Sequence, residues 1–375
     1  MFSVLKISVP DTYLKKDLLV RAASYLGFSI CAVYFFIMVT FVRKKLIFKY
    51  KKGKIKMKFY FAPFEGISWY VYRNLFAKHF EGPDYYVTPF ISPNQKREIR
   101  NKDKQDVLWE HNEGLNIIPQ IIGNRADEWV HTARQLQDMG YREVNLNLGC
   151  PSNTVAAKGK GAGFLARPAQ LKEFLEEIFK ELSDMEISVK TRVGKQDPEE
   201  FYELLDLFNS FPIKSLMIHP RIQKEFYRGT PHRKQFTYAY ENSKNPICYN
   251  GDIFRAEDYK RLIEDYPKLD EVMLGRGILA NPFLLEEIKG IGKPDKKRLR
   301  AFHDELFATY QELLFSEEVV LHKMKELWHY MICCFSHKEE YDKGLRKAKT
   351  LMEYKGIISA LFAEASLMEG AGYQP

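Results

Sequence analysis

The stretch that decides the fold class is residues 143–193, EVNLNLGCPSNTVAAKGKGAGFLARPAQLKEFLEEIFKELSDMEISVKTRV. It begins with EVNLNL (143–148) and ends with EISVKTRV (186–193), two short apolar runs typical of strands. Between them, residues 168–182 have the pattern of an amphipathic helix, and Pro168 opens it as helix starts allow. A strand, a helix and a second strand in this order predict a βαβ unit with parallel strands.

The same alternation continues on both sides of this unit from residue 57 onward. It predicts eight strands, at 58–62, 85–89, 115–121, 143–148, 186–193, 215–219, 246–250 and 271–275. It predicts helices near 68–79, 126–139, 168–182, 199–210, 233–243, 255–265 and 281–289. Repeats of this kind favour an α/β fold, a (β/α)8 TIM barrel over residues 57–292, with its chemistry at the C-terminal ends of the strands. An open doubly wound sheet is the competing fold, but no GxGxxG follows the first strand.

Beyond Pro294 the strand pattern stops. Four further helices are predicted, at 298–315, 318–335, 338–350 and 354–367. We therefore expect a small C-terminal all-α helical domain over residues 293–375.

The charge of the chain is unevenly distributed. The 375 residues are 45% hydrophobic and 28% charged, which excludes collagen-like, disulfide-scaffold and wholly disordered classes. The net charge of +8 comes from residues 1–56, which hold twelve Lys or Arg and two Asp; the rest holds 45 basic and 47 acidic residues. A polyanion site on the body therefore needs a local basic patch.

Two interpretations of residues 1–56 stay open. Residues 22–42 form an uncharged apolar run long enough to span a bilayer, and the Lys and Arg after it place the C-terminal side in the cytoplasm. Alternatively, Met57 is the natural start and the preceding residues are an upstream stretch of the gene model. Both interpretations place the catalytic body in the cytoplasm. Five cysteines without a CxxC pair agree with a reducing compartment.

Polar and reactive residues follow seven of the eight predicted strands. Such a residue alone is more often structural, but their joint position on one barrel rim predicts an active site. In chain order the clusters contain Glu65, Gln120, Asn147 and Cys150, Lys190 and Arg192, His219 and Arg221, Asn250 and Asp252, and Arg276.

These clusters closely resemble the tRNA-dihydrouridine synthase family, flavoenzymes that reduce uridine to dihydrouridine in tRNA. The most specific piece is NLGCPSNTVAAKGKGAGFLARP (147–168). Its companions follow in order, as VKTR (189–192), IHPR (218–221), YNGDI (249–253) and LGRG (274–277). Two positions depart from the family pattern. Phe64 stands where Met is common, and Pro220 interrupts the usual His-Gly-Arg triplet.

The resemblance implies a cofactor, a proton donor and a substrate. It implies that Cys150 is the catalytic proton donor and that NADPH or NADH reduces the flavin. The substrate is tRNA, with Asn147, Lys158 and Arg192 as substrate-binding candidates. We expect no metal and infer no protein partner. The implied FMN contacts are Ala62, Pro63, Phe64, Gln120, Lys190, His219, Asn250, Gly251, Asp252, Gly275 and Arg276.

Physical chemistry agrees with several of these roles. The glycines around Arg276 allow a chain segment to approach a phosphate, and the arginine offers a charge. Lys190 in the barrel mouth would favour an anionic reduced flavin, although an ion pair with Asp252 is its structural alternative. Cys150 begins a Gly-rich loop with three basic residues and no acid, which suits a mobile general acid. The Cys333–Cys334 pair is expected in a core.

A local basic rim favours RNA as the substrate. Residues 219–234 hold five Lys or Arg against Glu225 alone, with aromatic residues interleaved. Two other functions compete. An FMN barrel that reduces a free small molecule would need no basic rim, and a tRNA-binding protein without redox activity would need no Cys150 or Lys190.

Overall fold

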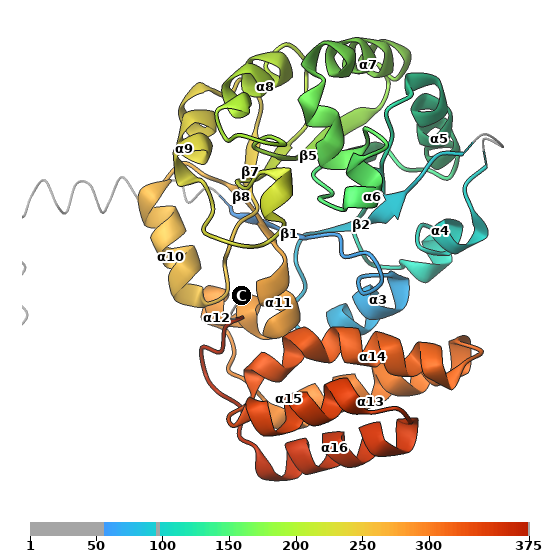
Figure 1. Cartoon of the computed structure of the whole chain (residues 1–375), viewed down its shortest axis with the longest axis vertical. Helices are drawn as coiled ribbons and strands as arrows, with labels where there is room; N and C mark the ends of the chain where they lie inside the picture. Colours follow the sequence, from blue (N-terminus) through green and yellow to red (C-terminus); the bar gives the residue numbers. More distant parts are fainter. Residues whose placement is uncertain (1–55, 95–97, 374–375) are drawn as a thin grey trace, which may run out of the picture. The chain divides into compact units, whose positions relative to one another are not determined.

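The computed structural model describes residues 56–94 and 98–373, and within them parallel strands close into a barrel (Figure 1). Each strand pairs with its neighbours in sequence, and β1 and β8 close the ring with Lys58 opposite Glu271. The TIM barrel is therefore confirmed, as are all eight predicted strands. They are β1 (Lys58–Phe61), β2 (Tyr85–Ile91), β3 (Ile117–Ile121), β4 (Glu143–Leu148), β5 (Glu186–Arg192), β6 (Leu216–His219), β7 (Ile247–Tyr249) and β8 (Glu271–Leu274).

Helices surround the barrel. The sequence did not predict α4, α6 and α11, which have only 5, 4 and 5 residues, because one helical turn has no detectable periodicity. The helices of the barrel region are α3 (Tyr70–His79), α4 (Asn101–Gln105), α5 (Ala126–Asp138), α6 (Asn153–Ala156), α7 (Pro168–Glu181), α8 (Glu200–Phe208), α9 (Arg233–Asn242), α10 (Ala256–Asp265), α11 (Arg276–Ala280) and α12 (Leu284–Lys289).

The β4–α7–β5 unit shows why these residues adopt this fold. Successive side chains of a strand point to opposite faces, so Val144 and Leu146 join the main core while Asn145 and Asn147 point into the barrel. Helix α7 begins at Pro168, which needs no hydrogen-bond donor there. It buries Leu171, Phe174, Leu175 and Ile178, each contributing about 1.5–3 kcal/mol of hydrophobic stabilisation.

The interior of the barrel is plugged below its polar mouth. A second buried cluster, separate from the main core, contains Tyr60, Ile118, Met217, Cys248 and Met273 from different strands. Filled interior layers are typical of TIM barrels. A ligand can therefore enter from one end only.

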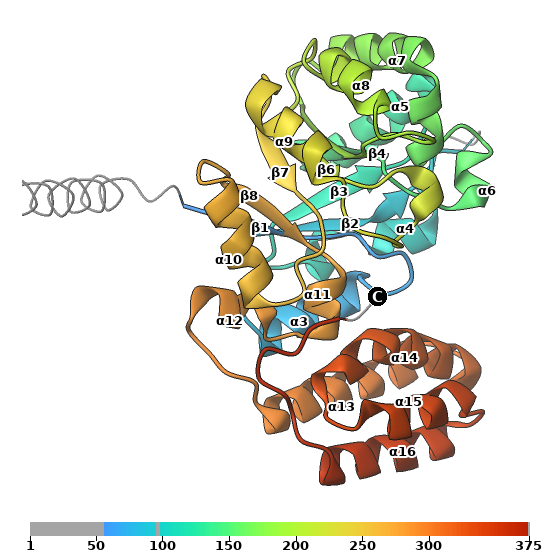
Figure 2. The ribbon, with the colours of Figure 1, turned by 60° about the vertical axis from the view of Figure 1, so that its left-hand side comes forward.

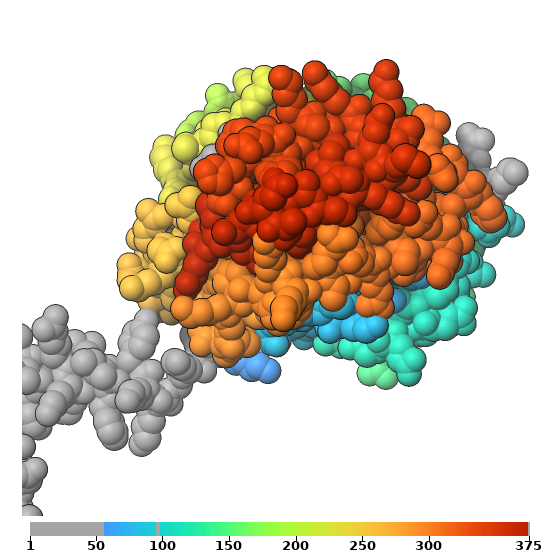
Figure 3. Space-filling model, turned by 90° about the horizontal axis from the view of Figure 1, so that it is seen from below, coloured from blue at the N-terminus to red at the C-terminus, as the bar shows by residue number. Residues whose placement is uncertain are grey.

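The helical domain follows the barrel and forms one continuous surface of orange and red atoms in Figure 3. Asp295 caps its first helix by accepting hydrogen bonds from two backbone N–H groups, and Thr350 caps its last helix. The prediction of a C-terminal all-α region is confirmed, with helix ends displaced by up to a turn. The helices are α13 (Lys296–Leu313), α14 (Glu317–Met331), α15 (Lys338–Lys347) and α16 (Leu351–Glu364) (Figure 2).

The helical domain packs on the first helix of the barrel. Phe302 of α13 makes edge contacts with Tyr72 and Phe76 of α3, with ring centroids 5.8 and 6.5 Å apart. The Trp69 indole N–H, just before α3, donates to the Tyr310 hydroxyl at 2.9 Å. Aromatic burial and a hydrogen bond thus connect residues far apart in sequence.

The predicted basic extension 1–56 and its apolar run 22–42 lie outside the described residues, apart from Lys56. Among the helices that are described, none has the length and apolar character needed to cross a membrane.

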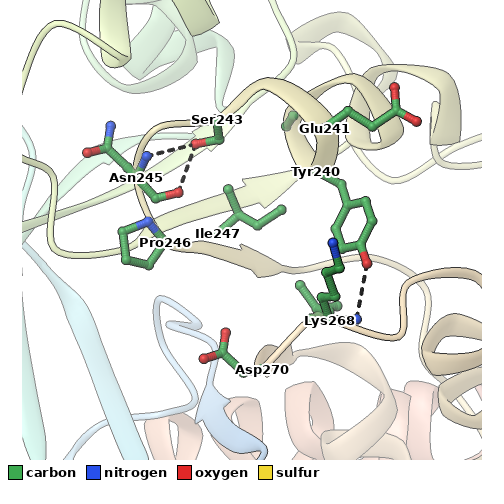
Figure 4. A pocket seen from close by; sticks show the side chains of 10 residues that line it. Tyr240, Glu241, Ser243, Asn245, Pro246, Ile247, Lys268 and Asp270 are labelled. Atoms are coloured by element: carbon green, nitrogen blue, oxygen red, sulfur yellow. Dashed lines mark hydrogen bonds between the residues drawn. The ribbon is translucent and has the colours of Figure 1, made fainter. Parts of the chain in front are cut away.

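A pocket of about 460 Å³ lies at the N-terminal ends of β7 and β8 (Figure 4). Ser243 and Asn245 in its wall hydrogen-bond each other, and the Lys268 backbone N–H donates to the Tyr240 hydroxyl. The pocket lies at the opposite end of the strands from Cys150 and Lys190, so it is separate from the candidate site.

Candidate active site

The barrel mouth gathers the reactive side chains from three neighbouring strands. Asn147 on β4 lies opposite Lys190 in the β4–β5 register, and Arg192 on β5 lies opposite His219 in the β5–β6 register. Cys150 follows the end of β4. A thiol, an ammonium and an imidazole therefore meet at the C-terminal end of the barrel, where the sequence placed them.

The ammonium of Lys190 has no hydrogen-bond or salt-bridge partner within residues 56–94 and 98–373. Burial, helped by the nearby charge of Arg192, lowers the pKa of Lys190 to about 8. The alternative ion pair with Asp252 does not form, because that carboxylate binds Arg221 and Arg276. A largely desolvated ammonium without a partner is unfavourable, so its position points to a polar or anionic ligand.

The turn that carries Cys150 is fixed by Asn147. The Asn147 side-chain oxygen accepts hydrogen bonds from the backbone N–H groups of Gly149 at 3.0 Å and Cys150 at 2.9 Å. Burial raises the pKa of the Cys150 thiol, so the thiol carries its proton at neutral pH. The Ser152 backbone N–H and the charge of Arg192 act in the opposite direction and would stabilise the thiolate once the proton has left.

A chain of buried side chains crosses three strands beneath this turn. The Asn147 amide N–H donates to the Gln120 side-chain oxygen at 2.6 Å, and the Gln120 amide donates to Asn145 at 2.8 Å. Asn145 in turn donates to the Ser188 hydroxyl at 2.9 Å. The chain fixes both predicted ligand contacts, Gln120 and Asn147, and leaves each amide one N–H for another partner.

The guanidinium of Arg192 forms hydrogen bonds with backbone carbonyls of the protein. Only 1% of it is exposed, its Nε donates to the Gly149 carbonyl at 2.9 Å, and its Nη1 donates to the Ile222 carbonyl at 3.0 Å. Burial lowers the pKa of Arg192 to about 10, so it stays charged. The arginine predicted to hold the base or the flavin thus also connects the Cys150 turn to the segment after β6.

Asp252 neutralises two arginines at the rim. It accepts from Arg221 through both carboxylate oxygens and from Arg276 at 2.7 Å. Arg221 also donates to the His219 Nε2 at 3.2 Å. Burial beside these charges lowers the pKa of His219 well below its usual value, so the ring is neutral. Its proton is therefore on Nδ1, which has no partner among the described side chains.

Arg276 does not offer a free charge. Its guanidinium lies 4.8 Å from the ring centroid of Tyr227 and 5.2 Å from those of Phe254 and Tyr373. The sequence predicts that Arg276 offers its charge to a phosphate. In the structure Asp252 and three aromatic rings already surround its guanidinium, so this prediction was incomplete. The Ile278 and Leu279 backbone N–H groups of α11 donate to the Gly275 carbonyl, so only the first two N–H groups of this helix, those of Arg276 and Gly277, are left as candidate anion donors.

Two of the three glycines at the last two strand ends, Gly251 and Gly277, are required by packing. A Cβ at Gly277 would lie 2.0 Å from the Ile253 carbonyl oxygen, and one at Gly251 would lie 2.2 Å from the Tyr249 hydroxyl. We expected Gly277 to allow close approach of an anion, but a neighbouring carbonyl already occupies that space. Gly275 has only ordinary contacts around it.

The turn after β1 and the end of β7 place the other predicted flavin contacts. The backbone N–H of Phe64 donates to the Ser68 hydroxyl at 2.8 Å, which fixes the Ala62–Pro63–Phe64 turn. The Asn250 side-chain amide donates one N–H to the Met273 carbonyl at 3.0 Å, so its second N–H and its oxygen remain for a ligand.

The basic rim is smaller than predicted. Arg221 is fully buried, and Arg233 and Lys234 form ion pairs with acidic side chains of neighbouring segments. Lys224 and Arg228 are exposed and unpaired within the described chain. Of the five predicted cations from residues 219–234, Arg221 alone is removed from solvent, and Arg233 and Lys234 are exposed but each has an acidic partner.

The segment after Cys150, which the sequence predicts to be a mobile loop, contains both exposed and packed residues. Phe164 and Leu165 are buried, and a Cβ at Gly163 would lie 2.3 Å from the Ala156 carbonyl oxygen. Lys158 is exposed at its tip.

Sequence reasoning missed Asn145 and Tyr373. Asn145 lies two residues before Asn147, and strand alternation alone would have placed it on the same inward face. No sequence signal places Tyr373 beside Arg276, because only the return of the chain from the helical domain brings them together.

Comparisons with known proteins identify the family of this chain. Residues 60–367 match the model of the dihydrouridine synthase family, described as "Dihydrouridine synthase (Dus)". A "Probable tRNA-dihydrouridine synthase" of Staphylococcus aureus (strain COL) is 29% identical over 267 residues, which cover 68% of this chain and 78% of the relative. The "tRNA-dihydrouridine synthase B" of Pasteurella multocida (strain Pm70) is 27% identical over 64% of this chain and 72% of its own. With a family match across both the barrel and the helical domain, the chain belongs to the dihydrouridine synthase family.

Proposed function

We propose that this protein reduces uridine in tRNA to 5,6-dihydrouridine with a bound flavin. The observation that carries the proposal is the unpaired ammonium of Lys190 beside the protonated thiol of Cys150, both in the mouth of the barrel. The printed names of the relatives, which are tRNA-dihydrouridine synthases, support the substrate.

FMN is the proposed flavin, and the residues present suit it. Lys190 would face its electron-rich ring edge, and the neutral His219 offers an N–H. The first backbone N–H groups of α11 would hold the phosphate. The remaining lining residues are Ala62, Pro63, Phe64, Gln120, Asn250, Gly251, Asp252, Gly275 and Arg276. When bound and reduced by NADPH or NADH, FMN supplies the hydride that adds to carbon-6 of the uracil ring.

Cys150 completes the reaction as general acid. Saturating the carbon–carbon double bond requires a hydride and a proton, and Cys150 gives its proton to carbon-5. The raised pKa of the thiol keeps that proton available at neutral pH. Asn147 and Arg192 hold the turn that positions the thiol, and the free N–H of Asn147 is available to the base.

The tRNA is proposed to bind across the rim and the helical domain over residues 293–375. Exposed Lys158, Lys224 and Arg228 provide phosphate contacts at the rim. Because the barrel is open at one end only, the target uridine has to leave its stack to enter the mouth.

The deciding experiment combines purified protein, FMN, NADPH and tRNA from a strain that lacks the gene. We expect a nucleoside heavier by about 2 Da, since reduction adds two hydrogens, and its position in tRNA by mass spectrometry identifies the target. Reduction of free uridine or an enone with untouched tRNA would instead indicate a small-molecule reductase. A protein that binds tRNA but cannot be loaded with flavin would indicate a binding function alone.

A further inference from the structure

Helix α14 of the helical domain contacts the turn that carries three of the proposed flavin contacts. The Lys323 ammonium donates a hydrogen bond to the carbonyl of Gly66 at 2.7 Å. The ring of Phe64 makes an edge contact with Tyr330, at a centroid distance of 6.0 Å. Two side chains of one helix therefore contact the segment after β1, one at Phe64 and one at Gly66, and we call residues 62–66 the β1 turn.

The ammonium of Lys323 lies in an aromatic site. It is 4.8 Å from the ring centroid of Trp69 and 5.8 Å from that of Tyr310. These two rings are held together by the indole N–H that donates to the phenol hydroxyl. Burial lowers the pKa of Lys323, and the cation–π contacts offset part of the lost hydration. The lysine is therefore fixed over the turn.

The turn itself has little freedom to move. Gly66 has a φ of +85°, a conformation that other residues rarely adopt, and a Cβ there would lie 3.2 Å from a carboxylate oxygen of Glu326 on α14. On the inner side, Ser68 accepts from the Phe64 N–H and donates to its carbonyl. The turn is thus held by the barrel on one side and by α14 on the other.

We propose that Lys323 is a positioning residue of the flavin site. By holding the carbonyl of Gly66, it keeps Pro63 and Phe64 in the conformation that lines the mouth, so cofactor affinity depends on the docking of α14. The inference rests on the proposed function, because it requires flavin in the mouth. It gives the helical domain a role in cofactor binding besides its proposed contact with tRNA.

The chain offers a matched control on the same helix. Lys325 is also half-buried and also donates to a backbone carbonyl, that of Ala348 at 2.9 Å, but this bond lies within the helical domain. We would prepare full-length Lys323→Met, Lys323→Arg and Lys325→Met proteins. FMN affinity of each apoprotein is measured by fluorescence titration, hydrogen exchange by the peptide covering residues 62–69, and stability by thermal unfolding.

For Lys323→Met we expect FMN affinity to fall about 5- to 10-fold, less than the loss of a charged hydrogen bond made directly to the cofactor, because the lysine acts through the turn. Exchange in residues 62–69 should accelerate in the apoprotein, where no flavin contributes. Lys323→Arg keeps a donor and a cation over Trp69, so its affinity should stay within about twofold of the original. Lys325→Met should lower stability and leave both readouts at the turn unchanged.

Two results would overturn the inference. If the unsubstituted protein binds FMN and Lys323→Met binds it equally well, Lys323 holds the helical domain on the barrel but does not position the flavin site. If Lys323→Met and Lys325→Met weaken FMN equally, the effect is general destabilisation. An unsubstituted protein that cannot bind FMN would instead refute the proposed function itself.

Discussion

The core of the helical domain and the mouth of the barrel both bury polar side chains, but they satisfy them differently. In the helical domain, Trp328 donates to the Tyr354 hydroxyl at 2.7 Å, and that hydroxyl lies 2.6 Å from His303 Nε2. His303 Nδ1 lies 2.7 Å from a carboxylate oxygen of Asp304. A carboxylate can only accept, so the neutral imidazole donates from Nδ1 to Asp304 and accepts at Nε2 from the phenol, which itself accepts from the indole. Each donor in this network has an acceptor within the helical domain, and we call such a network closed.

The hydrogen-bond network of the barrel mouth is not closed, because two of its polar groups have no partner within the described residues. The side-chain amides pair with one another, but the Lys190 ammonium and the His219 Nδ1 have no partner in the described chain. Polar burial is therefore a poor guide to function by itself. The group left without a partner, at the open end of the barrel, is what distinguishes a ligand site from a structural network.

The largest expected effect is on the thiol of the mouth. Cys150→Ala should lower the rate of dihydrouridine formation about 10²- to 10⁴-fold, the usual contribution of a positioned general acid. Reduction of the flavin by NADPH should continue, because it needs no proton from this thiol. Single-turnover measurements separate the two half-reactions.

The control is Cys333→Ala in the core of the helical domain, which should keep full turnover. Near-normal dihydrouridine formation by Cys150→Ala would remove the thiol from the mechanism. Equal loss of both half-reactions would indicate a folding defect.

The next effect contrasts the unpaired cation with the closed network. Lys190→Met should weaken FMN binding roughly 10- to 100-fold, since a charged hydrogen-bond donor is lost. The apoprotein should be as stable as before or more so, because an unpaired and largely desolvated charge has been replaced by an apolar chain. Flavin titration and thermal unfolding of the apoprotein measure the two changes. A destabilised apoprotein with normal FMN affinity would show that Lys190 has a structural role.

The opposite result is expected in the helical domain. Tyr354→Phe removes the hydroxyl that serves both Trp328 and His303, leaving two buried groups without partners. It should lower the free energy of unfolding by about 1–3 kcal/mol. FMN affinity should not change. Denaturant unfolding monitors the loss, and unchanged stability would mean that the closed network contributes nothing.

The smallest expected effect is a pH dependence that both regions share. Burial lowers the pKa of His303 and of His219, so the unfolded chain binds protons that the folded protein does not. The contribution of these two histidines to stability should be constant above about pH 6.5 and fall as the pH drops below it. Glu143, whose pKa burial raises to about 7, contributes with the opposite sign, so the difference between the protein and His303→Gln carries the histidine effect. Thermal unfolding between about pH 7.5 and 5.5 tests this sign. His303→Gln should reduce the slope, and an unchanged slope would assign it to other groups.

The sequence predicts a helix or strand well where the apolar residues of a segment repeat with a single period, either that of a strand or that of a helix. The prediction for β4 matches the structure at both ends, because alternating Val, Leu and Asn exclude a helix there. The helical domain was predicted with its last helix at 354–367, while α16 begins at Leu351, since its Thr350 cap was not recognised. Single-turn helices such as α4 are too short to show a periodic pattern in the sequence, so they are not predicted.

The site was predictable in its residue types and not in its pairings. The strand-end position of Cys150 and Lys190 follows from their order in the chain, and the structure places both at one mouth. Which arginine binds Asp252 depends on distances between three strand ends, and sequence spacing does not contain those distances. For the same reason the burial of Arg221 could not be foreseen.

The bond between Trp69 and Tyr310 also has a consequence for synthesis. The two residues are 241 positions apart, and at typical elongation rates the ribosome needs about 12 to 48 s between them. During that time the aromatic face of α3, with Tyr72 and Phe76, has no Phe302 to cover it. Until its last quarter has emerged, a nascent chain of this protein thus exposes the aromatic surface of α3, to which chaperones or another nascent chain can bind.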